Sequence, residues 1–243
     1  MENYGEVGQL KMPERNTSSV IGHAFEMFKG VFWYSLLAVI IYILGGWFLE
    51  MISGLDSQLI YDEMMSSGEG FATADIFAIK GVKTYYAASG LFGILISPLF
   101  VGLIYLANKY NNGQPHSWQD LFIGYRQNWI NIMLYSLISS IIIGISFALC
   151  FLPGLFVAPL FLFGFPVLLF ENANAIEAIQ KSFAIAKENY ATVLGIFLLG
   201  FLISIAGIIF CFIGILLTFP FIYVVMYSAY CAFVGKPRAL INQ

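Results

Sequence analysis

Four stretches of this chain contain no charged residue, and their lengths constrain the fold more than any other feature. They run from Gly30 to Leu49, Thr84 to Asn108, Gln127 to Phe170 and Asn189 to Gly235, and contain 20, 25, 44 and 47 residues. A helix needs roughly 20 apolar residues to cross the hydrocarbon core of a bilayer. Backbone polar groups in lipid must be paired within the chain, so these stretches are expected to be helical. The two longest have room for two spans each.

We therefore predict an all-α integral membrane protein with six transmembrane helices. The composition agrees, since 60% of the 243 residues are hydrophobic and 10% are charged, whereas soluble domains carry about 25% charged residues. Reversals of the chain are expected at Pro153-Gly154 and between Gly207 and Gly214. The predicted spans cover residues 31–52, 85–107, 129–151, 155–170, 191–209 and 214–234.

The distribution of basic residues predicts the orientation. Nine of the 11 Lys and Arg residues lie on the side that holds both termini, and only Lys80 and Lys83 lie on the other. The positive-inside rule places both termini in the cytoplasm and the loop of residues 53–83 outside. This loop is acidic, and its apolar residues predict a short helix on the membrane surface: Leu55, Leu59, Ile60, Met64 and Met65.

An amphipathic segment precedes the first, third and fifth predicted spans. Its apolar residues follow a spacing of four, three and four, which is typical of one face of an α-helix. The three copies are Ile21, Phe25, Phe28 and Phe32; Trp118, Phe122, Tyr125 and Trp129; and Ile179, Phe183, Ala186 and Tyr190. A basic residue follows the third apolar position in each copy, as Lys29, Arg126 and Lys187.

The residues expected to cap these segments are also polar in each copy. They are Thr17 or Ser18 in the first, Ser117 with Asp120 in the second and Asn174 with Glu177 in the third.

The repeat continues into the second span of each pair. There a glycine precedes a proline by five or six residues, and the prolines Pro98, Pro159 and Pro220 are expected to kink these helices. The predicted unit is thus an interfacial amphipathic helix followed by a transmembrane hairpin, repeated three times. The predicted boundaries are a polar tail at 1–16, repeats at 17–110 (with the loop 53–83), 111–171 and 172–235, and a tail at 236–243.

The sequence contains no set of residues that indicates catalysis or a cofactor. His23 and His116 lie on separate segments and are expected to be interfacial side chains, and no metal-ligand spacing is present. The net charge of -3 argues against nucleic acid as a partner. Cys150 and Cys211 are expected at external hairpin ends, which would allow a disulfide, whereas their apolar flanks favour buried thiols. We therefore predict a protein that is not an enzyme and binds no metal or cofactor.

The three basic residues have two interpretations. In the first, each amphipathic segment is an anchor whose cation meets head groups or the carbonyl groups of its own helix end. In the second, Lys29, Arg126 and Lys187 surround a pseudo-threefold axis and bind an anionic lipid head group. The aromatic residues expected at the interface are Phe25, Phe32, Phe122, Trp129, Phe183 and Tyr190.

The stretch from Pro166 to Tyr190 resembles a known membrane domain. A proline-containing span is followed by the acidic Glu171, an Ala-rich amphipathic helix with Ser182 and Lys187, and then Asn189-Tyr190. This pattern resembles the bacterial membrane domain joined to glycerophosphodiester phosphodiesterases, and related six-helix proteins. The resemblance covers about residues 150–235 and implies a bacterial inner (plasma) membrane location. The phosphodiesterase domain is missing, so its activity is not implied.

Three functions remain open from the sequence. The first is a non-enzymatic membrane protein that binds or organises lipid, or a subunit of a membrane complex, with membrane lipids and other membrane proteins as partners. The second is a transporter or exporter of a neutral or lipidic small molecule through a cavity between the proline-containing helices. The third is an assembly partner that acts through the acidic external loop.

Overall fold

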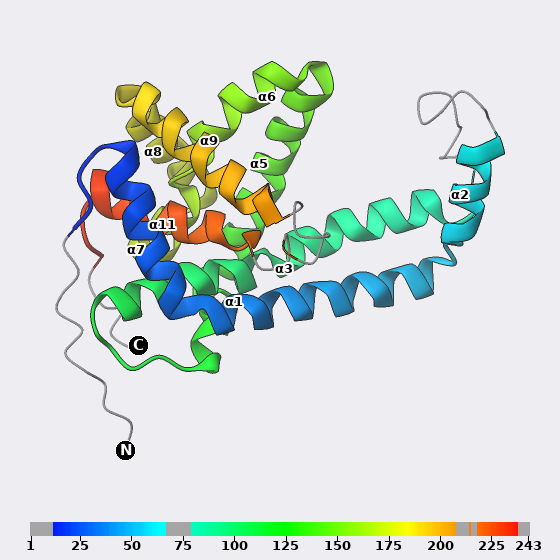
Figure 1. Ribbon diagram of the computed structural model, residues 1–243, viewed down its shortest axis with the longest axis horizontal. Helices are drawn as coiled ribbons and strands as arrows, with labels where there is room; N and C mark the ends of the chain where they lie inside the picture. The colour runs from blue at the N-terminus through cyan, green and yellow to red at the C-terminus, as the bar shows by residue number, and fades with distance from the viewer. Residues whose placement is uncertain (1–11, 67–78, 208–213, 215–217, 238–243) are drawn as a thin grey trace. The chain divides into compact units, whose positions relative to one another are not determined.

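The computed structural model describes residues 12–66, 79–207, 214 and 218–237 (Figure 1). Every secondary-structure element in these residues is helical. The elements are α1 (Thr17–Ser53), α2 (Ser57–Ser66), α3 (Val82–Asn111), the 3-10 helix η2 (Trp118–Phe122), α4 (Ile123–Arg126), α5 (Trp129–Leu149), α6 (Phe151–Val157), the 3-10 helix η3 (Ala158–Phe161), α7 (Gly164–Glu171), α8 (Ala175–Glu188), α9 (Tyr190–Ala206) and α11 (Phe221–Phe233).

Four helical segments are long and apolar enough to cross a bilayer, namely α1, α3, α5 and the continuous segment Phe151–Glu171. Together α8 and α9 would make a fifth, bent by 107°. The apolar helix α11 has 13 residues, and the predicted sixth span lies partly outside the described residues. These helices confirm the all-α prediction for the described part of the chain. They are consistent with a multi-pass membrane protein and give four or five candidate spans in the described residues, and the arrangement with six spans stays a prediction.

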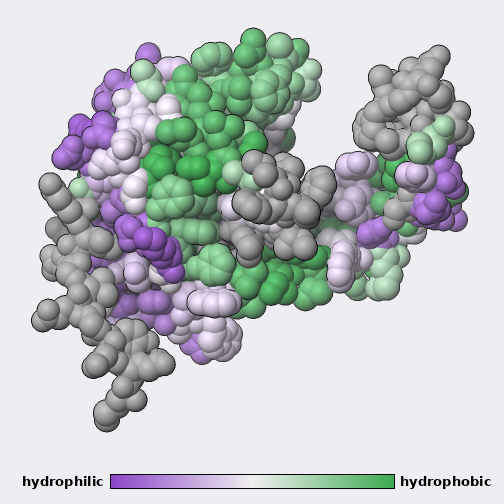
Figure 2. Space-filling view, in the orientation of Figure 1, coloured by the Kyte–Doolittle hydropathy of each residue, from purple (hydrophilic) through white to green (hydrophobic). Residues whose placement is uncertain are grey.

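Many large apolar side chains on these helices are exposed. Leu149 is 80% exposed, Phe151 63% and Leu152 60%. Figure 2 shows the resulting hydrophobic surface over α5, α6 and α9. Soluble monomers rarely expose continuous apolar patches of this kind, whereas a bilayer covers them.

The chain divides into two compact units, residues 1–39 with 97–243 and residues 40–96. In the second unit, the rings of Tyr42 and Phe92 stack with their centroids 5.8 Å apart, and the ring of Phe92 also contacts Gly45. This unit contains α2, so the prediction of a short helix in the loop is confirmed. The predicted repeat boundaries stay a prediction.

Side-chain caps explain where the helices begin. Asn16, and not Thr17 or Ser18, caps α1, since its Oδ1 accepts a hydrogen bond from the backbone N–H of Ser19 at 2.8 Å. At α8 the predicted capping box is present. Asn174 Oδ1 accepts from the N–H of Glu177 at 3.0 Å, and Glu177 Oε2 accepts from the N–H of Asn174 at 2.9 Å.

The three predicted amphipathic segments differ in how they join the spans that follow. The second and third are separate from α5 and α9, because Asn128 at φ 53° and Asn189 at φ -126° leave the helical conformation. The first is continuous with its span in α1. The position two residues after the basic residue is Asn in the second and third copies but Val31 in the first, and valine has no tendency to end a helix.

The core of the first unit is built from the segments that follow the three prolines. Phe100 of α3 stacks on Tyr223 of α11 at 5.0 Å, and Phe165 of α7 lies 6.2 Å from the same ring. Leu103 and Val224 are fully buried between these helices. The end of α3, the segment η3–α7 and α11 therefore form the centre on which the other helices of this unit pack.

Each proline has its own place in these segments. Pro98 lies inside α3, which continues through it. Pro159 lies in η3, where the α-helix is interrupted, and Pro220 is the N-cap of α11. All three are buried.

Candidate functional site

A cluster of buried polar side chains joins α1, α3 and α11. His23 Nδ1 lies 2.9 Å from Ser228 Oγ. The Asn111 amide donates to the hydroxyl of Tyr227 at 2.9 Å, and this hydroxyl donates to Asn108 Oδ1 at 3.1 Å. His23 Nε2, Asn108 Nδ2 and Asn111 Oδ1 are buried without a hydrogen-bond partner. Tyr227 and Ser228 are fully buried, whereas His23 also lines the pocket at the start of α1 that is described below.

The prediction of an interfacial His23 is wrong, because only 7% of this residue is exposed and its ring is bonded within the core. His116 is partly exposed, and its ring lies 5.4 Å from that of Tyr34. No group of His, Cys, Asp and Glu in the described residues has the arrangement of a metal site.

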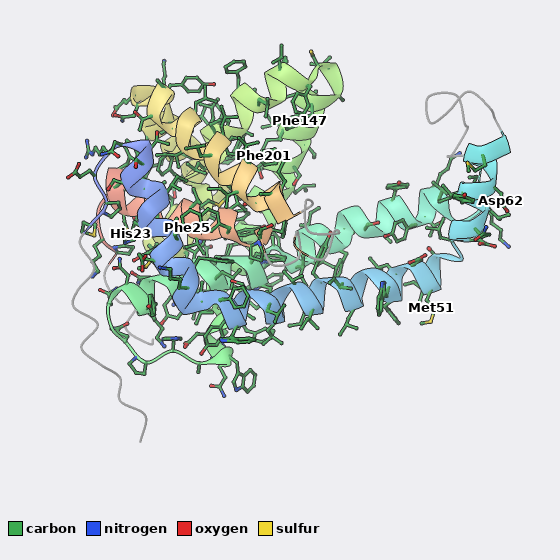
Figure 3. The ribbon with its side chains drawn as sticks, in the orientation of Figure 1. His23, Phe25, Met51, Asp62, Phe147 and Phe201 are labelled. Atoms are coloured by element: carbon green, nitrogen blue, oxygen red, sulfur yellow. The ribbon has the colours of Figure 1, made fainter. Side chains whose placement is uncertain are left out.

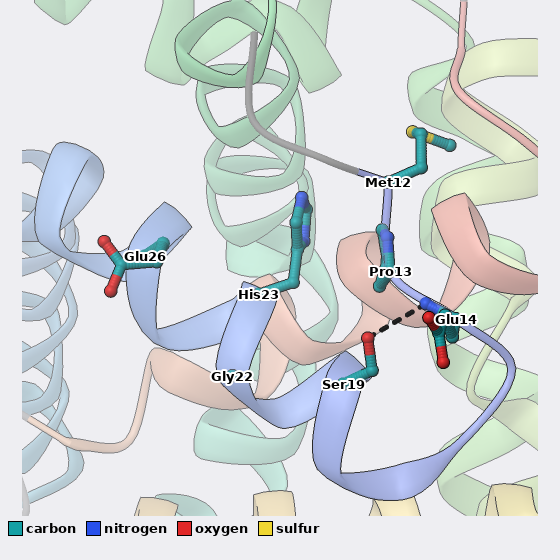
Figure 4. A pocket seen from close by; sticks show the side chains of 7 residues that line it. All are labelled: Met12, Pro13, Glu14, Ser19, Gly22, His23 and Glu26. Atoms are coloured by element: carbon teal, nitrogen blue, oxygen red, sulfur yellow. Dashed lines mark hydrogen bonds between the residues drawn. The ribbon is translucent and has the colours of Figure 1, made fainter. Parts of the chain in front are cut away.

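A pocket of about 320 Å³ lies at the start of α1 (Figure 4). Two carboxylates, Glu14 and Glu26, line it. Each has a partner in the chain, since Asn16 donates to Glu14 at 3.2 Å and Lys29 pairs with Glu26 at 2.7 Å. The N–H of Glu14 donates to Ser19 Oγ at 2.9 Å, which joins the segment before α1 to the first turn of this helix. The carboxylates of this pocket therefore already have partners within the protein.

A second pocket, of about 270 Å³, lies between α5, α6–η3–α7, α9 and α11, and we call it the α5–α9 pocket. Four of its residues follow each other at intervals of four along one face of α5 and so extend along the helix axis: Tyr135, Ser139, Ile143 and Phe147. The opposite wall includes Phe197 and Phe201 of α9. Figure 3 labels Phe147 and Phe201, which enter the pocket from α5 and α9.

The polar groups of the α5–α9 pocket are bonded to the backbone. The Tyr135 hydroxyl donates to the carbonyl oxygen of Phe161 at 2.7 Å, and Ser139 Oγ donates to the carbonyl oxygen of Tyr135 at 2.7 Å. All other lining residues are apolar. The pocket therefore suits hydrocarbon and offers no unused hydroxyl donor to a polar solute.

No family model, curated protein or solved structure matches this chain. The resemblance to the phosphodiesterase-linked membrane domain stays a prediction.

The three predicted head-group residues are all exposed in the first unit. Lys29 forms an ion pair with Glu26, with side-chain exposures of 68% and 51%. Arg126 ends α4 and Lys187 lies in the last turn of α8, and neither forms an ion pair in the part of the chain that the structure describes. No contact in the described residues joins two of the three.

Other cations of the first unit have structural partners. Lys109 bonds both carboxylate oxygens of Asp120 at 2.9 Å, and Lys181 bonds Glu171 at 2.5 Å. The Arg15 guanidinium donates to the carbonyl oxygens of Ala232 and Phe233 at the end of α11, at 3.2 and 3.3 Å. Lys236 Nζ donates to the carbonyl oxygen of Asn111 at the end of α3, at 3.1 Å.

The predicted interfacial aromatics are only partly at the surface. Trp129 is 47% exposed and Phe25 is 43% exposed, whereas Phe32, Phe122, Phe183 and Tyr190 are half-buried. Several of them hold helices together. The Tyr190 hydroxyl, for example, donates to the carbonyl oxygen of Phe156 at 2.8 Å and ties α9 to α6.

The lining of the α5–α9 pocket was not predicted from the sequence. Its α5 wall is the i+4 series that begins at Tyr135, directly beside the small-residue series Ser136, Ser140, Gly144 and Ala148. A small-residue series usually marks a helix contact, but Gly144 has no neighbouring atom within 4 Å of a Cβ position. The expectation that Cys150 is a buried thiol is wrong, because Cys150 is an exposed free thiol, and Cys211, its possible disulfide partner, lies outside the described residues.

Proposed function

We propose that this protein is a non-enzymatic, multi-pass membrane protein that binds a lipid, with one acyl chain in the α5–α9 pocket. The observation that carries the proposal is an apolar pocket among helices whose outer surfaces are themselves apolar. In a bilayer, the molecules that surround such a pocket are lipids. Water and polar solutes are excluded by the same surroundings.

The shape of the pocket supports an acyl chain as the occupant. Phe147 follows Tyr135 by 12 positions on α5, which corresponds to about 18 Å along the helix axis. Transmembrane helices are tilted by only about 20° on average from the bilayer normal, so a lipid tail along the normal runs nearly parallel to a spanning helix. Ile143, Phe147, Phe197 and Phe201 are partly exposed, so the pocket is open to the surrounding hydrocarbon.

We further propose the finer architecture of three repeats, with both termini in the cytoplasm of a bacterial cell and the protein in its plasma membrane. A cyclic set of contacts supports the repeats. Each amphipathic segment touches the region around the proline of the preceding repeat, and the first touches that of the last. The contacts are Gly124 with Pro98, Phe183 with Phe161 at 5.2 Å between ring centroids, and Phe25 with Phe221 at 4.8 Å.

The packing at the centre of the first unit favours lipid binding over transport through a central cavity. Leu103, Phe163 and Val224 are fully buried where the three central helices meet. The α5–α9 pocket lies away from α3, and residues of η3–α7 and α11 form only part of its wall beside α5 and α9. A protein that holds a lipid at its side needs no path through its centre.

Partner binding through the external loop is the second candidate. It is favoured by α2, which exposes 48% of Leu59, 55% of Tyr61 and 67% of Met65 beside the carboxylate of Asp62 (labelled in Figure 3). Deleting residues 56–80 without losing any crosslinked partner would exclude this role.

The lipid-binding proposal is tested by filling the pocket. Ile143→Trp places a larger side chain inside it, and Ile145→Trp makes the same change on the exposed face of α5, where Ile145 is 56% exposed. We expect native mass spectrometry of the gently extracted protein to show bound phospholipid on the wild type and on Ile145→Trp, and several-fold less on Ile143→Trp. Circular dichroism confirms that both variants keep their helices. Equal lipid retention by the two variants would exclude the pocket as the binding site.

A further inference from the structure

We infer that the lipid held in the α5–α9 pocket is an anionic phospholipid whose phosphate is bound by Lys187. This inference rests on the proposed function, because it assigns the head group of the lipid whose chain occupies the pocket. It assigns this role to Lys187 alone, although Lys29 and Arg126 occupy the equivalent position in the other two amphipathic segments.

The first link between Lys187 and the pocket runs through α8. The ring of Phe183 meets that of Phe161 edge to face at 5.2 Å, and Phe161 lines the pocket. Lys187 follows Phe183 by four residues on α8, so the two side chains lie on one face of the helix, one turn apart. Lys187 is exposed, whereas Phe183 is half-buried against η3.

The second link is at the junction of α8 and α9. Tyr190 begins α9 and donates to the carbonyl oxygen of Phe156 at 2.8 Å. Leu155, the neighbour of Phe156, lines the pocket, and α9 then supplies Phe197 and Phe201 to its wall. The end of α8 that carries Lys187 is therefore fixed at the edge of the pocket.

The charges around this edge favour a phosphate. Among the described residues Lys187 has no acidic partner, whereas Lys181 on the same helix is paired with Glu171. Glu188 is exposed, but neighbours in sequence point to different sides of a helix. An ammonium group on a flexible stem binds phosphate as a point charge. Lys29 differs from Lys187, because it forms an ion pair with Glu26 at 2.7 Å.

The test compares the lipid preference of four proteins: the wild type, Lys187→Gln, Lys187→Arg and Arg126→Gln. Each is delipidated in detergent, mixed with equal amounts of phosphatidylglycerol and phosphatidylcholine, and analysed by native mass spectrometry. We expect the wild type, Lys187→Arg and Arg126→Gln to bind phosphatidylglycerol about fivefold better, the factor that one basic residue near a membrane surface contributes. Lys187→Gln should bind both lipids equally.

Two further outcomes separate this inference from the proposed function. A preference that survives in Lys187→Gln, or that is lost equally in Arg126→Gln, would overturn the role of Lys187 while leaving the pocket in place. Diacylglycerol has no phosphate, so we expect Lys187→Gln to bind it as the wild type does and Ile143→Trp to bind it less. If Ile143→Trp retains every lipid, the proposed function fails, and the head-group assignment fails with it. If Lys187 only stabilised the end of α8, Lys187→Gln would lower the thermal midpoint without changing the lipid preference.

Discussion

Gly124 of α4 lies directly against the backbone carbonyl group of Pro98 in α3, so closely that a Cβ atom on Gly124 would overlap the proline backbone. The same two segments meet a second time at Gly102, where a Cβ atom would overlap the backbone of Leu121. Two glycines, one on each side, thus allow the backbones to touch. This contact fixes η2–α4 against the part of α3 that forms the core.

Replacing Gly124 by leucine should therefore destabilise the first unit. The obstacle is backbone, which cannot move aside as a flexible side chain does, and overpacking of this kind costs about 1–3 kcal/mol or more. The measurement is the free energy of unfolding in detergent micelles, by denaturant titration. Gly144→Leu is the matched control, because nothing lies within 4 Å of a Cβ atom there. Equal stability of the two variants would contradict the close contact.

Asn16→Ala should cost about 0.5–2 kcal/mol, the usual contribution of an N-cap side chain. The reason is its 2.8 Å bond from the N–H of Ser19 at the start of α1. Ser18→Ala removes an exposed hydroxyl two residues after Asn16 and should change the stability by less than about 0.5 kcal/mol. Thermal unfolding followed by circular dichroism distinguishes the two variants, and a larger loss for Ser18→Ala would return the cap to that residue.

Asn128 and Asn172 both have positive φ, 53° and 51°, but only the first has an amide used in long-range bonds. Asn128 Nδ2 donates to the carbonyl oxygens of Leu168 at 3.1 Å and Ala173 at 2.7 Å. Glycine suits the backbone at both positions, so the substitutions isolate the amide. We expect Asn128→Gly to lower the free energy of unfolding by about 1–3 kcal/mol, from the unpaired carbonyl groups. Asn172→Gly should be close to neutral, and a similar loss in both would show that the amide contributes nothing.

The ion pair between Lys109 and Asp120 should matter more than the pair between Lys29 and Glu26. The side chains of Lys109 and Asp120 are 19% and 16% exposed, and both carboxylate oxygens are bonded. Asp120→Asn should cost about 1–3 kcal/mol, since it leaves a half-buried cation without its partner. Glu26→Gln breaks an exposed pair and should cost less than about 1 kcal/mol. Chemical denaturation at low and high salt provides the comparison, and only the Glu26→Gln effect should vanish in high salt.

Uncharged stretches were enough to predict helices, because membrane lipid leaves an apolar segment no other way to pair its backbone. The capping box at Asn174 was equally visible, since it depends on residues three positions apart. The continuity of α1 was not predicted. It depends on Val31 in place of an asparagine, a difference that becomes meaningful only once Asn128 and Asn189 are seen to end their segments.

The candidate site was harder to predict, because its walls come from distant parts of the chain. The i+4 series from Tyr135 to Phe147 reads as ordinary apolar helix surface until Phe197 and Phe201 are placed opposite it. The basic residues were visible as a repeated pattern. Their different partners were not, since the pairing of Lys29 with Glu26 and the absence of an ion pair at Lys187 depend on side-chain positions.

The rings of Phe25 in α1 and Phe221 in α11 lie 4.8 Å apart, so this contact joins the first and the last helix of the described residues. During synthesis, α1 leaves the ribosome before α11 is made, so Phe25 gains this contact only at the end of synthesis. A chain that stops before Phe221 lacks the ring on which both Phe25 and Phe28 pack. The aromatic face of α1 therefore gains its long-range packing only when α11 is complete.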